Sequence, residues 1–134
     1  MSTLEVAKAL SPLIGSQTDQ LWSAAMAVIV AEIYIACRFF SQIGGNVRWL
    51  PTGLLMATSI VCHLVSLGSG YLTKGALIEM TRTAAKGGDF AEAYANAALT
   101  SLVQFGSLAL GLILFIIVFG LDFSGIARII GRQE

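Results

Sequence analysis

The stretch "AVIVAEIYIACRFF", residues 27–40, places one acidic side chain in the middle of an apolar run. It belongs to an apolar segment over residues 21–40, and further segments of about twenty or more mostly apolar residues follow at 51–72 and 97–121. At ~1.5 Å of helix rise per residue, each segment can cross a hydrocarbon core of ~30 Å. The sequence therefore predicts an all-α integral membrane protein with three transmembrane helices.

The composition favours the same fold class. The chain has 134 residues, of which 56% are hydrophobic and 12% charged, whereas roughly a quarter are charged in an ordinary soluble domain. A soluble protein of this length could not bury three such helices on all sides. The formal net charge is zero, so the sequence indicates no nucleic-acid partner. Glu5 and Lys8 interrupt the N-terminal stretch, and no signal-peptide pattern precedes the first span, which we expect to remain as an anchor.

We interpret residues 1–134 as one membrane domain, because the length suits a single domain. Ser2 and Glu5 fit a capping box that would begin a short helix at the membrane surface, and we expect Pro12 and Gly15 to end this helix. The expected parts are an interfacial segment 1–18, a first transmembrane helix 19–43, a second helix 51–86 with an extension beyond the membrane, a third helix 89–121, and an interfacial tail 122–134.

Short connections determine the expected arrangement of these helices. The glycines of "GGN" (44–46) can end the first helix, Pro51 suits the first turn of the second, and "KGGD" (86–89) separates the second from the third, with Asp89 as the cap. Helices joined by short loops lie side by side and run in opposite directions. The sequence therefore predicts an antiparallel up-down bundle.

Aromatic residues indicate where the bilayer surfaces lie. We expect one interface at Trp22, Tyr71 and Tyr94, and the other at Trp49 with Phe39, Phe40 and Phe123. Lysine and arginine are shared equally between the two sides, and five acids lie on the side opposite the C-terminus. We expect a cytoplasmic C-terminus. The retained first span and the low cysteine content suit a bacterial inner membrane.

Each predicted span carries one strongly polar side chain near its middle: Glu32, His63 and Gln104. A charged group at the bilayer centre costs at least ~2.5 kcal/mol, so these side chains should face protein and lie close together in depth. Small and polar residues at helical spacing extend the same faces and predict helix-packing stripes: Ser59, Ser66 and Gly70 in the second span, and Ser101 and Gly111 in the third.

Two interpretations of this polar cluster remain open. Glu32, His63 and Gln104 can form one hydrogen-bonded knot that fixes helix packing, which we favour, or they can line a proton or ion pathway. We expect no metal site and no cofactor, because a single histidine cannot supply both axial ligands of a bis-histidine haem. Outside the predicted membrane spans, the sequence offers no Ser–His–Asp arrangement, no phosphate-binding loop and no pair of catalytic carboxylates. We therefore expect that the protein is not an enzyme.

Three functional classes follow. The favoured one is a non-catalytic small subunit of a larger membrane-embedded assembly, which oligomerises or docks through the polar and small-residue stripes. Its partners would be the lipid bilayer and other membrane subunits or copies of itself. The alternative is a homo-oligomeric channel or small proton-linked transporter that uses Glu32 and His63, and the third is a holin-like pore former. The chain carries no motif that assigns it to a known family.

Overall fold

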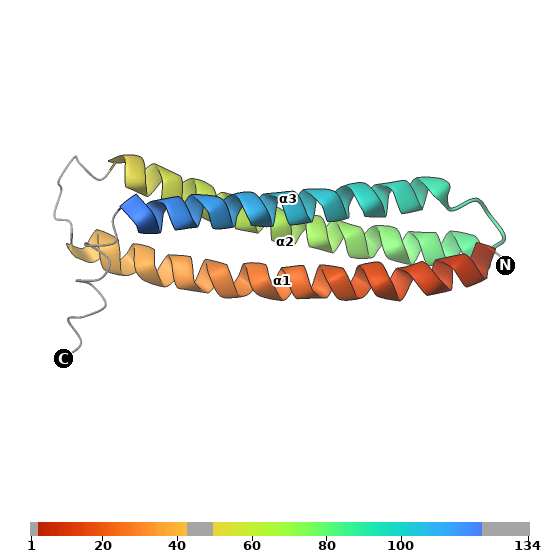
Figure 1. The fold of residues 1–134 in the computed structure, drawn as a ribbon. Coiled ribbons are helices and arrows are strands. Elements are labelled where there is room, and N and C mark those ends of the chain that lie inside the picture. Colours follow the sequence, from red (N-terminus) through yellow and green to blue (C-terminus); the bar gives the residue numbers. More distant parts are fainter. Residues whose placement is uncertain (1–2, 43–49, 122–134) are drawn as a thin grey trace.

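A computed structural model describes residues 3–42 and 50–121, which form three α-helices and no strand (Figure 1). The helices are α1 (Thr3–Gln42), α2 (Leu50–Ala85) and α3 (Ala91–Leu121). Each of the three is long and apolar enough to cross a membrane. The chain is therefore all-helical over the described ranges and has the character of an integral membrane protein. The predicted tail 122–134 and the predicted anchor Trp49 lie outside the described residues.

Helix α1 differs from the prediction at its start. The sequence predicted a separate helix that ends at Pro12 and Gly15, and this prediction is wrong because α1 continues without a break from Thr3 to Gln42. The first turns of α1 pack on the ends of α2 and α3, where Ala7 joins a buried cluster with Leu77, Met80, Ala84 and Ala97. Burial of this apolar face outweighs the backbone hydrogen bond that proline removes.

The turn between α2 and α3 follows the prediction. Gly87 has a φ of 72°, a left-handed conformation that glycine adopts without steric cost. The N–H of Gly88 donates to the carbonyl of Thr83 (3.0 Å) and that of Gly87 to the carbonyl of Ala84 (3.1 Å), the two bonds of a Schellman motif. The carboxylate of Asp89 accepts from the N–H of Ala91 (2.9 Å) and caps α3.

The three helices lie side by side, and neighbouring helices run in opposite directions (Figure 1). Helix α2 packs against both α1 and α3. All of its buried positions except Ser69 alternate at spacings of three and four residues, a repeat that produces coiled-coil-like packing. These positions are Met56, Ser59, His63, Ser66, Gly70, Thr73, Leu77, Met80 and Ala84. Buried residues seven apart face them from the neighbouring helices: Thr18, Ala25 and Glu32 in α1, and Ala97, Gln104, Gly111 and Val118 in α3.

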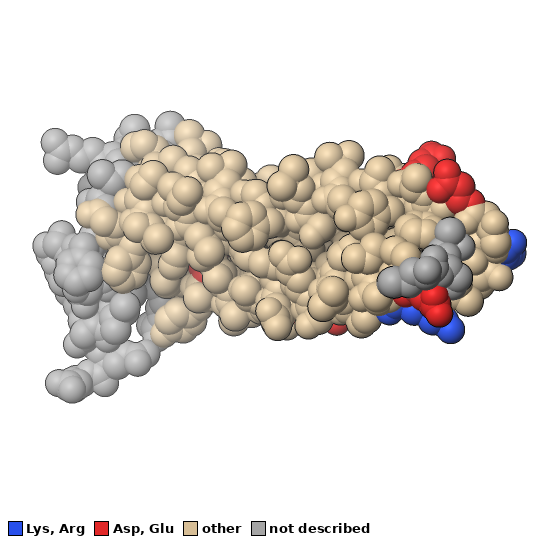
Figure 2. Space-filling view, turned by 45° about the vertical axis from the view of Figure 1, so that its right-hand side comes forward, with Lys and Arg blue, Asp and Glu red and all other residues tan. Residues whose placement is uncertain are grey.

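The outside of the bundle is apolar over most of its length. Large side chains such as Leu64, Leu102 and Ile116 are exposed, which a protein dissolved in lipid tolerates and a soluble protein does not. In Figure 2 most of the coloured charged side chains lie at one end of the rod, and the length of the rod is mainly covered by other residues. That end holds the α2–α3 turn and the start of α1 (Figure 1).

Candidate functional site

The most polar part of the interior lies where α1, α2 and α3 meet at Glu32, Ser59, His63 and Gly111. The side chains of Glu32, Ser59 and His63 are fully buried. Oε2 of Glu32 lies 3.1 Å from Nδ1 of His63, and Oε1 forms a hydrogen bond with the hydroxyl of Ser59. The Ser59 hydroxyl also lies 2.8 Å from the backbone carbonyl of Gly111. A carboxyl, a hydroxyl and an imidazole are thus joined across all three helices.

Gly111 allows the imidazole to reach this position. A Cβ built on Gly111 would lie 2.6 Å from Cε1 and 2.7 Å from Nε2 of His63, which is closer than van der Waals contact permits. The His63 ring therefore packs directly on the α3 backbone. Gly111, predicted as a packing residue, forms one wall of the Glu32 cluster.

Gln104 belongs to a second layer of the bundle. Its Nε2 donates to the backbone carbonyl of Thr18 (3.1 Å), and the hydroxyl of Ser66 donates to the Gln104 carbonyl (2.9 Å). A Cβ on Gly70 would lie 2.7 Å from the same Nε2, so the Gln104 amide occupies the space beside this glycine. Gln104 and Gly111 are seven positions apart, which corresponds to about 10 Å along α3. The hydrogen bonds of Gln104 therefore join it to Thr18 and Ser66, not to Glu32 and His63.

A third layer contains Thr73 and Thr100, which were not among the predicted site residues. The hydroxyl of Thr73 lies 2.9 Å from the Ser69 carbonyl and 2.8 Å from the hydroxyl of Thr100. The Thr100 hydroxyl lies 2.8 Å from the carbonyl of Asn96. Thr73 continues the buried three-four repeat of α2, and that spacing was the signal that could have identified it. We call the three layers together the polar seam, which comprises Thr18, Glu32, Ser59, His63, Ser66, Thr73, Thr100 and Gln104.

Three buried polar atoms in the seam have no hydrogen-bond partner among the residues that the structure describes: Thr18 Oγ1, His63 Nε2 and Gln104 Oε1. Buried polar atoms without a partner are uncommon in folded proteins. His63 Nε2 is the chemically distinctive atom of the three, because an unprotonated imidazole nitrogen is basic and can accept a proton.

The predicted packing stripes face the inside of this one chain. Ser59, Ser66, Gly70 and Gly111 are buried between its helices, and Ser101 is half-buried. A second subunit could not contact the buried residues without separating the helices. Within this chain the stripes therefore pack helix against helix, and the outer faces of the bundle are the exposed surfaces.

Of the predicted interfacial aromatic residues, Trp22, Tyr71 and Tyr94 lie on the outside of the bundle, at two levels. Trp22 and Tyr71 are exposed. Trp22 lies beside Gly70 of α2, because a Cβ built on Gly70 would lie 3.3 Å from Cδ1 of Trp22. Tyr94 is also exposed, but the Thr73–Thr100 hydrogen bond sets the register of α2 and α3. Counting from that bond, Tyr94 lies about 12 Å beyond Tyr71, toward the charged end.

An ion pair marks the level of Trp22. Lys74 Nζ lies 2.5 Å from Oδ1 of Asp19 and 6.0 Å from the centre of the Trp22 ring. Over the ranges 20–37, 51–73 and 93–120, Glu32 is the only acidic or basic residue apart from His63. The contacts of Lys74 with Asp19 and Trp22 therefore mark the boundary between the charged end of the bundle and its apolar part.

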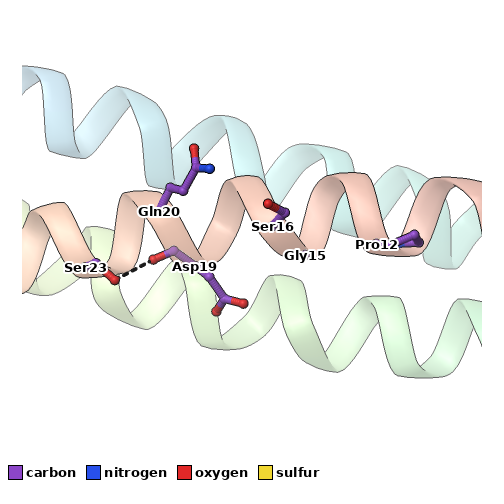
Figure 3. Close-up of a pocket in the computed structure, with 6 residues that line it drawn as sticks. All are labelled: Pro12, Gly15, Ser16, Asp19, Gln20 and Ser23. Atoms are coloured by element: carbon purple, nitrogen blue, oxygen red, sulfur yellow. Dashed lines mark hydrogen bonds between the residues drawn. The ribbon is translucent and has the colours of Figure 1, made fainter.

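An open groove on α1 lies next to this boundary. Figure 3 shows the six residues that line it, all from α1: Pro12, Gly15, Ser16, Asp19, Gln20 and Ser23. The Ser23 hydroxyl donates to the Asp19 carbonyl (2.9 Å), as the dashed line shows. The groove presents small and polar side chains of a single helix. Within the described ranges, no three histidine, cysteine or acidic residues are placed to hold a metal ion.

Comparisons of this chain with protein families, with curated proteins and with solved structures find no match.

Proposed function

We propose that this protein is a non-catalytic subunit of a larger assembly in a membrane, and that its three helices cross the bilayer as an up-down bundle. The main observation in support of this proposal is that the side chains of the polar seam form hydrogen bonds with one another and with the backbone of neighbouring helices. Ser59, Ser66, Thr73 and Gln104 form hydrogen bonds to neighbouring helices of the same chain, so these polar groups serve to join the helices.

Two glycines beside the polar seam, Gly70 and Gly111, support the same proposal. His63 occupies the space beside Gly111, and Gln104 occupies the space beside Gly70. Side chains therefore close the interior at both layers. A closed interior suits a structural component better than a transporter, which needs a path between its helices.

The outer faces are the surfaces available for contact with lipid and with other subunits. Exposed apolar residues such as Val30, Leu102 and Ile113 come from α1 and α3. Without a hydrophobic driving force between helices in lipid, association depends on close packing. We propose that partner subunits or further copies of the chain pack on these faces, and that the protein resides in a bacterial inner membrane with its C-terminus in the cytoplasm.

Native mass measurement and flux measurement test this proposal together. Protein extracted from its own membrane in a mild detergent should be found with other polypeptides or in multiples of its 14.1 kDa mass. Purified protein in liposomes should carry no proton or ion flux, and Glu32→Gln should leave that background unchanged. A monomer without partners, or a flux that Glu32→Gln abolishes, would contradict the proposal.

Proton-linked transport is the second candidate, and one observation favours it. Glu32 and His63 form a fully buried pair of ionisable groups, and His63 Nε2 has no partner in the part of the chain that the structure describes. Ionisable groups inside transmembrane helices often serve proton transfer. In this case Glu32→Gln and His63→Gln should both abolish a flux that wild-type liposomes show, while Gln104→Leu, in the separate layer, should retain it.

A further inference from the structure

The number of protons in the Glu32 cluster can be counted from its contacts. The Ser59 oxygen contacts two other oxygens, the backbone carbonyl of Gly111 and Oε1 of Glu32. A serine hydroxyl carries one proton, and a carbonyl oxygen can only accept. If Ser59 donates its proton to Gly111, the contact between Ser59 and Glu32 requires a proton from Glu32.

The same count determines the proton on His63. With the Glu32 proton on Oε1, Oε2 can only accept a hydrogen bond. Nδ1 of His63, 3.1 Å away, must then carry a hydrogen and donate it. A neutral imidazole has one N–H, so Nε2 carries a lone pair. This assignment agrees with the absence of a partner for Nε2 among the described residues, since a bare nitrogen leaves no N–H unsatisfied.

The alternative is a carboxylate paired with an imidazolium, which holds the same number of protons. In that form the single Ser59 proton would have to serve two acceptors, and one of its two short oxygen contacts would hold no proton. The Nε2–H of His63 would be buried with no acceptor among the described residues. This form also buries two charges at a site where Glu32, Ser59 and His63 are fully enclosed. Desolvation makes such a pair costly unless its hydrogen bonds are complete.

No other charged group faces the cluster within the described residues. Helix α1 contributes Glu32, α2 contributes Ser59 and His63, and α3 contributes the backbone of Gly111. We infer that Glu32, Ser59 and His63 form an uncharged proton-holding site in which Glu32 is a carboxylic acid, His63 is the Nδ1–H tautomer, and Nε2 is a bare nitrogen able to accept a further proton.

Nitrogen NMR of the full chain in lipid bilayers tests the inference directly. The sequence contains one histidine, so ¹⁵N-histidine labelling gives two ring signals that need no assignment by mutation. At neutral pH, Nδ1 should show a directly bonded hydrogen and Nε2 should show none. Two protonated nitrogens, or a hydrogen on Nε2 alone, would overturn the inference.

Two substitutions at Glu32 provide an independent test. The amide of Glu32→Gln can donate to Ser59 and accept from His63, as the neutral acid does, so both ring signals should retain their protonation state. If Glu32 were ionised, this substitution would convert an imidazolium to a neutral ring and change the spectrum. Glu32→Leu removes the acceptor and should give a mixture of tautomers.

Infrared spectroscopy reports on the acid itself, including a case in which Glu32→Leu does not fold. The wild-type protein at neutral pH should show a protonated carboxyl stretching band that is lost in Glu32→Gln. Absence of this band from the wild type would contradict the inference. Both spectra can be recorded on protein without transport activity or partners, so their outcome is separate from that of the native mass and flux measurements.

Discussion

Glu32 of α1 and His63 of α2 are in direct contact, with Oε2 and Nδ1 3.1 Å apart, although 31 residues separate them in sequence. The pair lies inside the apolar length of the bundle, and Gly111 of α3 completes the site beside the His63 ring. Together, the Glu32–His63 contact and the packing of the His63 ring on Gly111 join all three helices. Substitutions around this site should act on the stability of the whole bundle.

Ser59→Ala should destabilise the protein by about 1 kcal/mol. The substitution removes a hydroxyl that links Glu32 to Gly111, and interhelical hydrogen bonds in membrane proteins contribute about 0.6 to 1.7 kcal/mol. Thr58→Ala is the matched control, because the Thr58 hydroxyl bonds to a carbonyl of its own helix and is exposed. Reversible denaturation in mixed micelles measures both, and equal losses for the two variants would argue against a special role of Ser59.

Gly111→Ala should destabilise the protein by about 1 to 3 kcal/mol, the usual cost of overpacking a filled interior. The added methyl group would meet the buried His63 ring at 2.6 Å. Gly106→Ala, in the same helix, is the control, because a Cβ there meets nothing within 4 Å. Alanine has the higher helix propensity, so the control should be neutral or stabilising. A Gly111→Ala variant as stable as Gly106→Ala would contradict the packing of His63 on α3.

Pro12→Ala should stabilise the protein, because Pro12 lies inside the continuous helix α1. Proline is about 3 kcal/mol less favourable than alanine in a helix interior. Pro51→Ala is the control, since Pro51 lies in the first turn of α2, where proline is tolerated. Thermal unfolding of both variants measures the difference. Equal midpoints would indicate that the helix ends near Pro12, as the sequence alone predicted.

Lys74→Gln should lower stability by less than about 1 kcal/mol. Lys74 pairs with Asp19 and lies over Trp22, but both charged side chains are about half exposed, and exposed ion pairs contribute about 0.2 to 1 kcal/mol. Lys86→Gln, on the exposed α2–α3 turn, controls for loss of one positive charge. The difference between the two variants should shrink as salt concentration rises, and a salt-independent difference would indicate that packing on Trp22 dominates.

The sequence predicted those parts of the fold that local chemistry determines. Helices α2 and α3 begin and end within two residues of the predicted ranges, because a positive-φ glycine and an aspartate cap define the turn between them. The inward orientation of Glu32 and His63 was predictable because an apolar environment penalises polar groups at the surface.

Properties that depend on three-dimensional packing were not predictable. The continuation of α1 through Pro12 depends on contacts of Ala7 with residues of α2 and α3, which no local pattern contains. The partner of Gln104 depends on the axial offset between helices, because Thr18, which accepts its hydrogen bond, lies 14 residues or about four turns from Glu32 in α1. The sequence predicted similar depths for Glu32, His63 and Gln104. Depth estimated by counting residues was not accurate enough to separate the layer of Glu32 and His63 from the layer of Gln104.

The Glu32–His63 contact within one chain is tested most directly by solid-state NMR in bilayers, using ¹³C-labelled glutamate carboxyls and ¹⁵N-labelled histidine. Because the chain has one histidine, any glutamate carbon that couples to its ring reports this pair. We predict a coupling that corresponds to about 3–4 Å between the carboxyl carbon and Nδ1, consistent with the short contact of a hydrogen-bonded pair. It should persist when labelled chains are diluted in unlabelled ones and disappear in Glu32→Gln. No coupling, or a coupling seen only between separately labelled chains, would contradict a three-helix bundle closed around its own polar seam.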